Sequence, residues 1–352
     1  MPDSFEYTSN ATPADLAARI SACTDACVIT HQKPDGDAMG SLLAAVRMCR
    51  ALGKRAVGYI AGAVDPNIQS LAEPGEVRHV SRGLPGPSHD LVMVVDTGSR
   101  SQLEPFLPWL EPRRDSVILI DHHRSGDDLA ALRLVRPECA SATMVVADVV
   151  RALDISMVRP GGSAHRSIAE AMFAGLATDT GWFRFSSADS AAFALASELL
   201  ALGVDKSTLY RQLEENERPE RLAATAQALA SLRFLQDGRI AVMQLRPEDF
   251  ERSKARPEDI GGVVNSTMMV GSVCVSILMT EQERGITKMS FRSKPRGTGQ
   301  PFFDVNVLAG QFNGGGHAQA AGGRVKLSMD DAWAMAQPII EAFGPESADA
   351  QG

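Results

Sequence analysis

Three short, uninterrupted apolar runs constrain the fold of this chain more than any other feature. They are ACVIT (26–30), DLVMVVD (90–96) and DSVILID (115–121), and the last two are rich in Val and Ile. A strand that is apolar on both sides has both faces covered, as in a parallel sheet packed between helices. The runs therefore predict the core of an α/β domain.

Segments with helical periodicity separate these runs. Apolar residues recur at helical spacing within 38–53, from Met39 to Cys49, and Gly53 suits a C-terminal cap. A further strand is expected at 55–62, and further helices are expected at 15–22 (capped near Thr12), 140–153 and 166–181. The alternation of strands and helices predicts a doubly wound parallel sheet.

The second half of the chain has a different pattern. Residues 190–232 are helical and charged, and strands are expected at 239–245, 273–280 and 286–293, before a glycine cluster (313–323) and a last helix near 330–343. We therefore expect an α/β protein with an N-terminal doubly wound parallel-sheet domain and a smaller α/β C-terminal domain, joined by a helical connector. The predicted boundaries are 1–190, 191–232 and 233–345, with a tail at 346–352.

Charge and composition limit the partners. The formal net charge of −8 argues against a protein that coats long or duplex nucleic acid. The N-terminus lacks the basic and apolar regions of a signal peptide, and no apolar run approaches the roughly 18 residues of a membrane span. The five cysteines show no zinc-ribbon spacing and are expected to be small buried residues. A cytoplasmic protein with no membrane partner is the expectation.

Acids and imidazoles follow the predicted strands or end a predicted helix. They are His31, Asp35, Asp37, Asp96, His122, His123 and Asp179. Ligands of parallel α/β sheets bind beyond the carboxyl ends of the strands, so these side chains are expected to meet there. Asp35 and Asp37 flank Gly36 in what reads as a tight turn, from which each carboxylate would face a different ion.

Four carboxylates in one crevice repel one another unless positive charge lies among them. A mixed His/Asp set suits Mn²⁺, Fe²⁺ or Zn²⁺, and the carboxylate majority favours Mn²⁺. Two ions about 3.5–4 Å apart would satisfy the whole set. A single Asp at a strand end more often caps a helix or a turn, so the metal prediction rests on the joint occurrence of these residues.

Six motifs together resemble those of the DHH phosphoesterase superfamily with its DHH-associated C-terminal domain. They are HQKPDGDAMGS (31–41), VVDTGS (94–99), LIDHH (119–123), GLATDTGWF (175–183), FRS (291–293) and NGGGHAQAAGG (313–323). The motifs span nearly the whole chain. They are most similar to the group of short-oligoribonucleases (nanoRNases) that also act as 3′-phosphoadenosine 5′-phosphate (PAP) phosphatases.

The resemblance implies a role for each candidate residue. Two divalent metal ions would be bound, with Mn²⁺ favoured and Mg²⁺, Co²⁺ or Fe²⁺ as alternatives. The implied metal ligands are His31 and Asp35 for the first ion, Asp37, His122 and Asp179 for the second, and Asp96 for both. The implied catalytic residues are His123, Arg292 and His317, and the implied substrate-binding residues are Arg292, Ser293, Gly314, Gly315, Gly316 and His317.

A few positions leave alternatives open. Gly126 and Asn313 depart from the family pattern, which often has Asn and Gly there, and these departures bear on neighbouring contacts and substrate preference. Ser141 and Thr143 are expected to cap a helix. For the basic residues Lys288, Lys294 and Arg296, a solvated edge and a contact with the nucleotide backbone are equally supported. The aromatic residues Trp182, Phe183 and Phe185 are expected to pack under the site in preference to stacking on a base, and His79, His89 and His165 are expected on the surface.

The resemblance implies a phosphodiesterase and phosphatase that degrades very short oligoribonucleotides to mononucleotides and removes the 3′-phosphate of PAP. Its expected partners are short RNA, nucleotide phosphates and a second copy of the chain in a homodimer. Alternatives are a phosphodiesterase for cyclic or linear dinucleotide second messengers and a single-strand DNA exonuclease of the RecJ type. A non-enzymatic regulatory module that binds nucleotides or metals without turnover is a further alternative, and it would predict the loss of at least one metal ligand.

Overall fold

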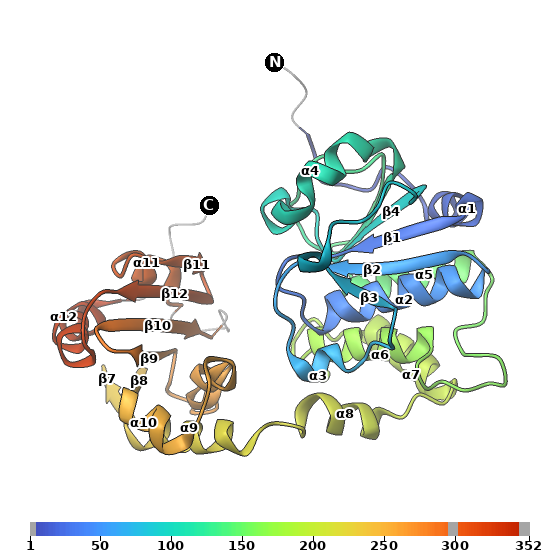
Figure 1. The fold of residues 1–352 in the computed structure, drawn as a ribbon. Helices are drawn as coiled ribbons and strands as arrows, with labels where there is room; N and C mark the ends of the chain where they lie inside the picture. Colours follow the sequence, from blue (N-terminus) through green and yellow to red (C-terminus); the bar gives the residue numbers. More distant parts are fainter. Residues whose placement is uncertain (1–4, 295–301, 345–352) are drawn as a thin grey trace. The chain divides into compact units, whose positions relative to one another are not determined.

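The computed structural model describes residues 5–294 and 302–344, which fall into two compact units, Met1–Asn216 (unit 1) and Glu217–Gly352 (unit 2). Each unit contains its own six-stranded sheet (Figure 1). Arg296 of the predicted basic run and the predicted tail at 346–352 lie outside the described residues.

The sheet of unit 1 is parallel throughout, with the strand order β3-β2-β1-β4-β5-β6. Its strands are β1 (Asp25–Ile29), β2 (Arg55–Ile60), β3 (Val77–His79), β4 (Leu91–Val95), β5 (Val117–Asp121) and β6 (Leu132–Val135). The three predicted apolar runs form β1, β4 and β5, which are buried at every residue. The strand order reverses between β1 and β4, and such a reversal opens a crevice at the carboxyl ends of the strands.

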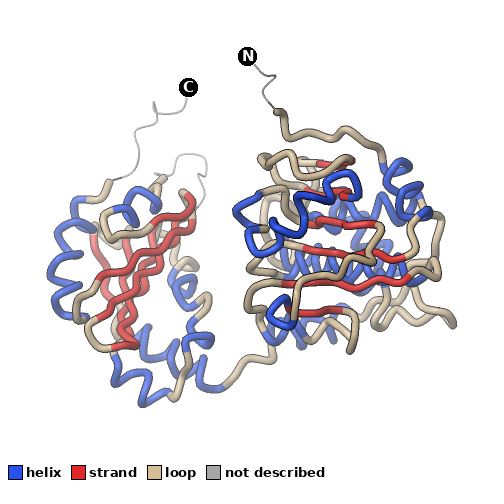
Figure 2. Tube along the Cα trace, turned by 45° about the horizontal axis from the view of Figure 1, so that its top comes forward, coloured by secondary structure: helices blue, strands red, loops and turns tan. Residues whose placement is uncertain are grey.

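Helices cover both faces of this sheet, as the predicted doubly wound fold requires (Figure 2). They are α1 (Pro13–Ala22), α2 (Gly36–Ala51), α3 (Pro66–Gln69), α4 (Leu107–Leu110), α5 (Ala142–Ala152), α6 (Ile168–Asp179), α7 (Ser190–Ala201) and α8 (Lys206–Glu214). Val28 and its alternate neighbours pack with α2, α5 and α6, whereas Cys27 and Ile29 pack with the segment around α4. This alternation explains why the strands are apolar on both sides.

Helices α2 and α6 pack closely because Gly40 has no side chain. A Cβ at this position would lie 2.6 Å from Ala171 O and 2.9 Å from the Cα of Gly175. At the same interface, a Cβ on Gly36 would overlap the side chain of Thr178. The first turn of α2 therefore lies against the last turn of α6.

Unit 2 has a mixed sheet of order β11-β12-β10-β9-β8-β7, in which the β8–β9 pair is parallel and the other pairs of described strands are antiparallel. Its strands are β7 (Arg233–Leu235), β8 (Ile240–Leu245), β9 (Val275–Glu283), β10 (Ile286–Ser293), β11 (Gly315–His317) and β12 (Ala320–Val325). Its helices are α9 (Pro219–Ala230), α10 (Pro247–Ser253), α11 (Val305–Gly310) and α12 (Met329–Ala342). One core joins the sheet to α11 and α12, and a second joins it to α9 and α10.

Some predicted elements differ from the structure. Helix α2 begins at Gly36, so Asp37 lies in its first turn and Asp35 is its N-cap; the expected tight turn at Gly36 is wrong. Strands β3, β6 and β7 were not predicted, because short edge strands lack a continuous apolar run. Strand β11 lies within the predicted glycine cluster (313–323), and β12 begins in it.

The prediction that His89 lies on the surface is wrong. Its side chain is 7% exposed, and its Nδ1 lies 2.9 Å from Asp25 Oδ1. A buried carboxylate partner thus draws this loop residue inward, whereas His165 is 69% exposed, as expected. All five cysteines are free, and four of them are buried. Within residues 5–294 and 302–344, no helix combines the length and apolar character that crossing a membrane requires.

Candidate metal centre

The structure brings the seven predicted acids and imidazoles of unit 1 together beyond the carboxyl ends of β1, β4 and β5. They form three overlapping groups in which the ligand atoms lie within 4.8 Å of one another: His31 with Asp35 and Asp96, Asp37 with His122 and Asp179, and Asp96 with His122 and His123. The first two groups contain the residues expected for two separate ions. Asp96 and His122 connect the groups.

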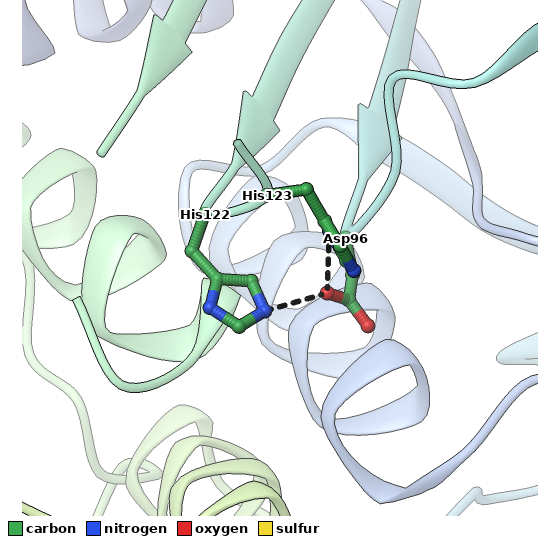
Figure 3. Close-up of side chains that lie close together, drawn as sticks. All are labelled: Asp96, His122 and His123. Carbon is green, nitrogen blue, oxygen red and sulfur yellow. Dashed lines mark ion pairs between the residues drawn. The ribbon is translucent and has the colours of Figure 1, made fainter. Parts of the chain in front are cut away.

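Asp96 faces the two histidines of the loop after β5, His122 and His123 (Figure 3). Its Oδ2 is 3.5 Å from His31 Nε2, and its Oδ1 is 3.4 Å from His122 Nε2. The backbone of Asp96 has φ 59°, in the left-handed region that residues other than glycine rarely adopt. Residues in strained backbone conformations often lie at functional sites. Here the strained residue directly follows β4 and carries the carboxylate that faces both groups.

Asp37 is held by the start of helix α5. Its Oδ2 accepts a hydrogen bond from Ala142 N at 2.6 Å, and its Oδ1 accepts one from Thr143 N at 3.1 Å. The side chain is buried, and the helix N-terminus supplies partial positive charge to it. Ser141 caps α5 by accepting from Met144 N, which confirms its expected capping role. Sequence reasoning did not connect this helix to Asp37.

The two histidines of the DHH motif are oriented by different partners. His122 Nδ1 lies 3.2 Å from Cys139 O, which assigns the proton to Nδ1 and leaves Nε2 for the carboxylates. His123 Nδ1 lies 2.7 Å from Asp121 Oδ1, and the His123 side chain is 52% exposed. Sequence reasoning did not single out Asp121, although its place in LIDHH was a signal.

The carboxylates and imidazoles shift one another's protonation. Burial, followed by Asp96 and Asp179, raises the pKa of Asp37, and burial raises the pKa of Asp179 to about 6. Burial lowers the pKa of His122, but the carboxylates of Asp96, Asp37 and Asp179 outweigh it and raise that pKa to about 10. Burial opposes the charge on Asp96, yet the nearby imidazoles of His122 and His31 lower its pKa. The cluster is thus an acidic site that favours bound positive charge.

The residues present fit a pair of divalent cations. Asp96 Oδ1 is buried and has no hydrogen-bond partner among the described residues, even though His122 Nε2 approaches it. A buried carboxylate oxygen without a partner is unfavourable, and a cation bound to it would remove that cost. The donor set of carboxylate oxygens and imidazole nitrogens matches the chemistry of Mn²⁺, Fe²⁺ or Zn²⁺.

The predicted substrate residues of unit 2 lie on β10 and in or next to β11. Arg292 is half-buried on β10, and its Nη1 donates to Phe291 O at 2.9 Å. Ser293 is buried and its hydroxyl donates to Ala318 O at 3.0 Å, so this donor is already used within the unit. Lys288 and Arg292 lie four residues apart on β10 and therefore face the same side of the sheet.

The glycine segment serves a packing purpose. A Cβ on Gly314 would lie 2.0 Å from Gly322 O, so a side chain there is excluded by the neighbouring strand. Gly314 N donates to Ala309 O and Gly316 N donates to Asn306 Oδ1, which leaves these two N–H groups engaged within unit 2. Gly315 and the exposed His317 pair with β12. Asn313 has φ 53°, a conformation that Asn tolerates better than most residues, so it suits this position in place of glycine.

The aromatic residues after Asp179 divide into two kinds. Trp182 and Phe183 pack against Phe173, with ring centroids 6.5 Å and 6.0 Å from its ring, which confirms the expected packing. Phe185 is 56% exposed, so the same expectation is wrong for it. After the end of α6 the backbone leaves the helical conformation, and Trp182 and Phe183 both have positive φ.

Comparison with known proteins identifies the class to which this fold and site belong. Residues 25–176 match the DHH family, N-terminal domain, and residues 237–342 match the DHHA1 domain. The fold and site are those of a metal-dependent phosphoesterase. The chain belongs to the DHH phosphoesterase family with a DHHA1 domain, whose members typically bind divalent metals.

The relatives span most of the chain. It is 30% identical over 322 residues to the "Bifunctional oligoribonuclease and PAP phosphatase NrnA" of Thermus thermophilus, covering 91% of this chain and 89% of that protein. The protein of the same name from Bacillus subtilis is 23% identical over 318 residues, covering 90% and 94%. An exopolyphosphatase-related protein from Bacteroides fragilis has a TM-score of 0.81 at 22% identity, covering 96% and 98%. That likeness confirms the predicted fold class.

Proposed function

We propose that this protein is a two-metal phosphoesterase that hydrolyses very short oligoribonucleotides to mononucleotides and removes the 3′-phosphate of PAP. The relatives named as oligoribonuclease and PAP phosphatase support this choice of substrates. The observation that carries the two-metal proposal is the position of Asp96, with one oxygen near His31 and the other near His122. We propose Mn²⁺ as the favoured ion because carboxylates form the majority of the donors.

Each residue of the cluster has a proposed part. His31 and Asp35 would hold one ion, Asp37, His122 and Asp179 the other, and Asp96 both. When bound, divalent ions supply Lewis acidity to a phosphoryl group and lower the pKa of the attacking water. The start of α5 and the carbonyl of Cys139 keep the Asp37 and His122 donor atoms in place for this purpose.

The remaining candidates would bind the substrate. Nδ1 of His123 is engaged by Asp121, so we assign its other ring nitrogen, Nε2, to the substrate phosphate. We assign Arg292 and His317 of unit 2 to phosphate as well, since a guanidinium and an imidazole donate charge-assisted hydrogen bonds. In the hydrolysis of a phosphodiester, the water oxygen bonds to phosphorus as the bond to the leaving nucleoside oxygen breaks.

A substrate panel tests the proposal. The purified full chain is assayed with RNA of two to ten nucleotides, PAP, linear and cyclic dinucleotides and single-stranded DNA, with Mn²⁺ and with a chelator. We expect the largest kcat/KM for the shortest RNA, measurable release of phosphate from PAP, and no turnover with chelator. Preferred turnover of cyclic dinucleotides or of long single-stranded DNA would show that the proposed substrates are wrong. If no substrate is turned over, the proposal that the protein is an enzyme is refuted. We also propose that the chain forms the homodimer that the resemblance implies, and light scattering tests this.

A further inference from the structure

The N-terminal segment is fastened to the edge of the unit 1 sheet. Ser9 Oγ donates to Val135 O and accepts from Val135 N, both at 2.8 Å. The backbone N–H groups of Asn10 and Ala11 donate to Arg133 O at 3.0 and 3.1 Å. These bonds cover the otherwise unpaired edge of β6 and fix where Tyr7, two residues before Ser9, can lie.

The ring of Tyr7 fills a space that two glycines leave open. A Cβ on Gly98 would lie 2.0 Å from Tyr7 Oη, and a Cβ on Gly126 would lie 2.4 Å from Tyr7 Cε2. Gly98 lies two residues after Asp96, and Gly126 lies three residues after His123. The ring therefore contacts both loops that carry the central residues of the candidate metal centre.

The hydroxyl of Tyr7 completes the hydrogen bonding of a buried carboxylate. Tyr7 Oη donates to Asp121 Oδ2 at 2.5 Å, while Asp121 Oδ1 accepts from His122 N at 2.8 Å and from His123 Nδ1 at 2.7 Å. Asp121 is fully buried, so its two oxygens depend on these partners. Burial, followed by the charge of Asp121, raises the pKa of Tyr7, which keeps the hydroxyl a donor.

We propose that Tyr7 is a positioning residue for His123, acting through Asp121. The phenol holds Oδ2, so that Oδ1 faces His123 Nδ1 and the imidazole is fixed with Nε2 as its remaining nitrogen. The inference rests on the proposed function, in which that nitrogen contacts the substrate. The hydroxyl takes no part in fastening the segment to β6, because Ser9, Asn10 and Ala11 make those bonds.

Four variants and a matched control test the inference. Tyr7→Phe removes only the hydroxyl, and Tyr7→Ala removes the whole ring. Gly126→Ala forces the ring to move, and Tyr7→Ala/Gly126→Ala combines the new methyl with loss of the ring that it would meet. The control is Phe5→Leu, which changes the packing of the same segment but keeps the Tyr7 hydroxyl, since the Phe5 ring lies 6.5 Å from the Tyr7 ring and 4.9 Å from the Arg133 guanidinium. The kcat and KM for a small chromogenic phosphodiester are measured with Mn²⁺, together with the Kd for Mn²⁺.

We expect Tyr7→Phe to lower kcat about tenfold, the scale of losses when the partner of a site histidine is removed. KM, the Kd for Mn²⁺ and the activity of Phe5→Leu should stay within about twofold of the unmodified protein. Gly126→Ala should also lower kcat, but adding it to Tyr7→Ala should cause no further loss, because the two changes disturb one contact. Additive losses, or full kcat in Tyr7→Phe, would overturn the link to catalysis.

A second readout needs no turnover. In the metal-free protein labelled with ¹⁵N-histidine, the ring N–H signals report the His123 Nδ1–H bond to Asp121. We expect this signal to shift in Tyr7→Phe and Gly126→Ala, and to stay in place in Phe5→Leu. An unchanged His123 signal in Tyr7→Phe overturns the inference whatever the turnover. If the unmodified protein hydrolyses no phosphoester, the proposed function fails and the His123 signal alone decides the positioning role.

Discussion

The two units hold their candidate residues in contrasting ways. In unit 1, three of the seven acids and imidazoles are held by hydrogen bonds to neighbouring groups: Asp37 by the start of α5, His122 by Cys139 O and His123 by Asp121. In unit 2, the Arg292 guanidinium donates only to the neighbouring carbonyl of Phe291 among the hydrogen bonds of the described residues, and His317 is exposed on the edge strand β11. Groups fixed before a ligand arrives suit chemistry, whereas groups with few internal partners suit the capture of a ligand.

This contrast predicts a division of labour. Changes in unit 1 should lower kcat and metal binding, and changes in unit 2 should raise KM while leaving metal binding intact. Each experiment below either separates the two units by these readouts or shows that the division is wrong.

The largest effect is expected for Asp96→Asn. The amide keeps the shape of the side chain but loses the charge that both groups of ligands share, so binding of both ions should weaken. We expect kcat to fall on the order of 10³-fold, because metal ions supply several kcal/mol of transition-state stabilisation. The Asp205→Asn control changes an exposed helix cap in the same unit and should keep full activity. Two Mn²⁺ ions bound to Asp96→Asn with unmodified affinity, measured by calorimetry, would contradict the shared role.

A second strong effect concerns pH and metal removal in unit 1. The pKa of Asp179 is raised to about 6 and that of His122 to about 10, so the folded metal-free protein holds more protons than the unfolded chain. The stability of the metal-free protein should therefore fall as pH rises from about 5 to 10. The affinity for Mn²⁺ should change in the opposite direction over the same range, because the protons must leave before the ions bind.

Chemical denaturation at pH 6 and pH 8, with chelator and with Mn²⁺, tests the predicted direction of both pH dependences, that of the metal-free stability and that of the Mn²⁺ affinity. Mn²⁺ should raise the denaturation midpoint more at pH 8 than at pH 6. In Asp96→Asn this metal-dependent gain should disappear. A metal-free protein that becomes more stable from pH 6 to pH 8 would show that the raised pKa values of Asp179 and His122 do not control this dependence.

The central part of the site could be predicted because its sequence signals are local. The runs that form β1, β4 and β5 are apolar on both sides, and each is followed by polar residues. Parallel strands carry such residues to one edge, so the meeting of Asp96 with His122 follows from topology. The resemblance to the family added a second sequence signal, because the motifs occur together and in the family's order along the chain.

The parts that could not be predicted depend on contacts between distant segments. Tyr7 and Asp121 are 114 residues apart and meet only because the N-terminal segment follows β6. The start of α2 was misread because Pro34 and Gly36 favour a turn, whereas packing against Thr178 requires a glycine there. His89 was misplaced because its buried partner, Asp25, lies 64 residues earlier in the chain.

A moderate effect is expected for Arg292→Ala in unit 2. Loss of a charge-assisted hydrogen bond costs about 1.5–3 kcal/mol, which corresponds to a rise in KM of roughly 10- to 100-fold. Mn²⁺ binding should be unchanged. Arg292→Lys keeps the charge but not the two-pronged geometry, and it should recover part of the affinity. A loss of kcat at unchanged KM would place Arg292 with the chemistry and would weaken the proposed division between the units.

The smallest effect is expected for Lys288→Gln. Lys288 and Arg324 face each other across β10 and β12 and line a hollow that also contains Thr280 and Ser290. Two like charges at such close range favour an anion between them. For RNA of several nucleotides, we expect KM to rise about two- to fivefold at low salt and the difference to vanish at high salt. PAP, which is a single nucleotide, should be unaffected. Lys326→Gln changes an exposed lysine of the same unit outside the hollow, so an equal effect there would reduce the role of Lys288 to general surface charge.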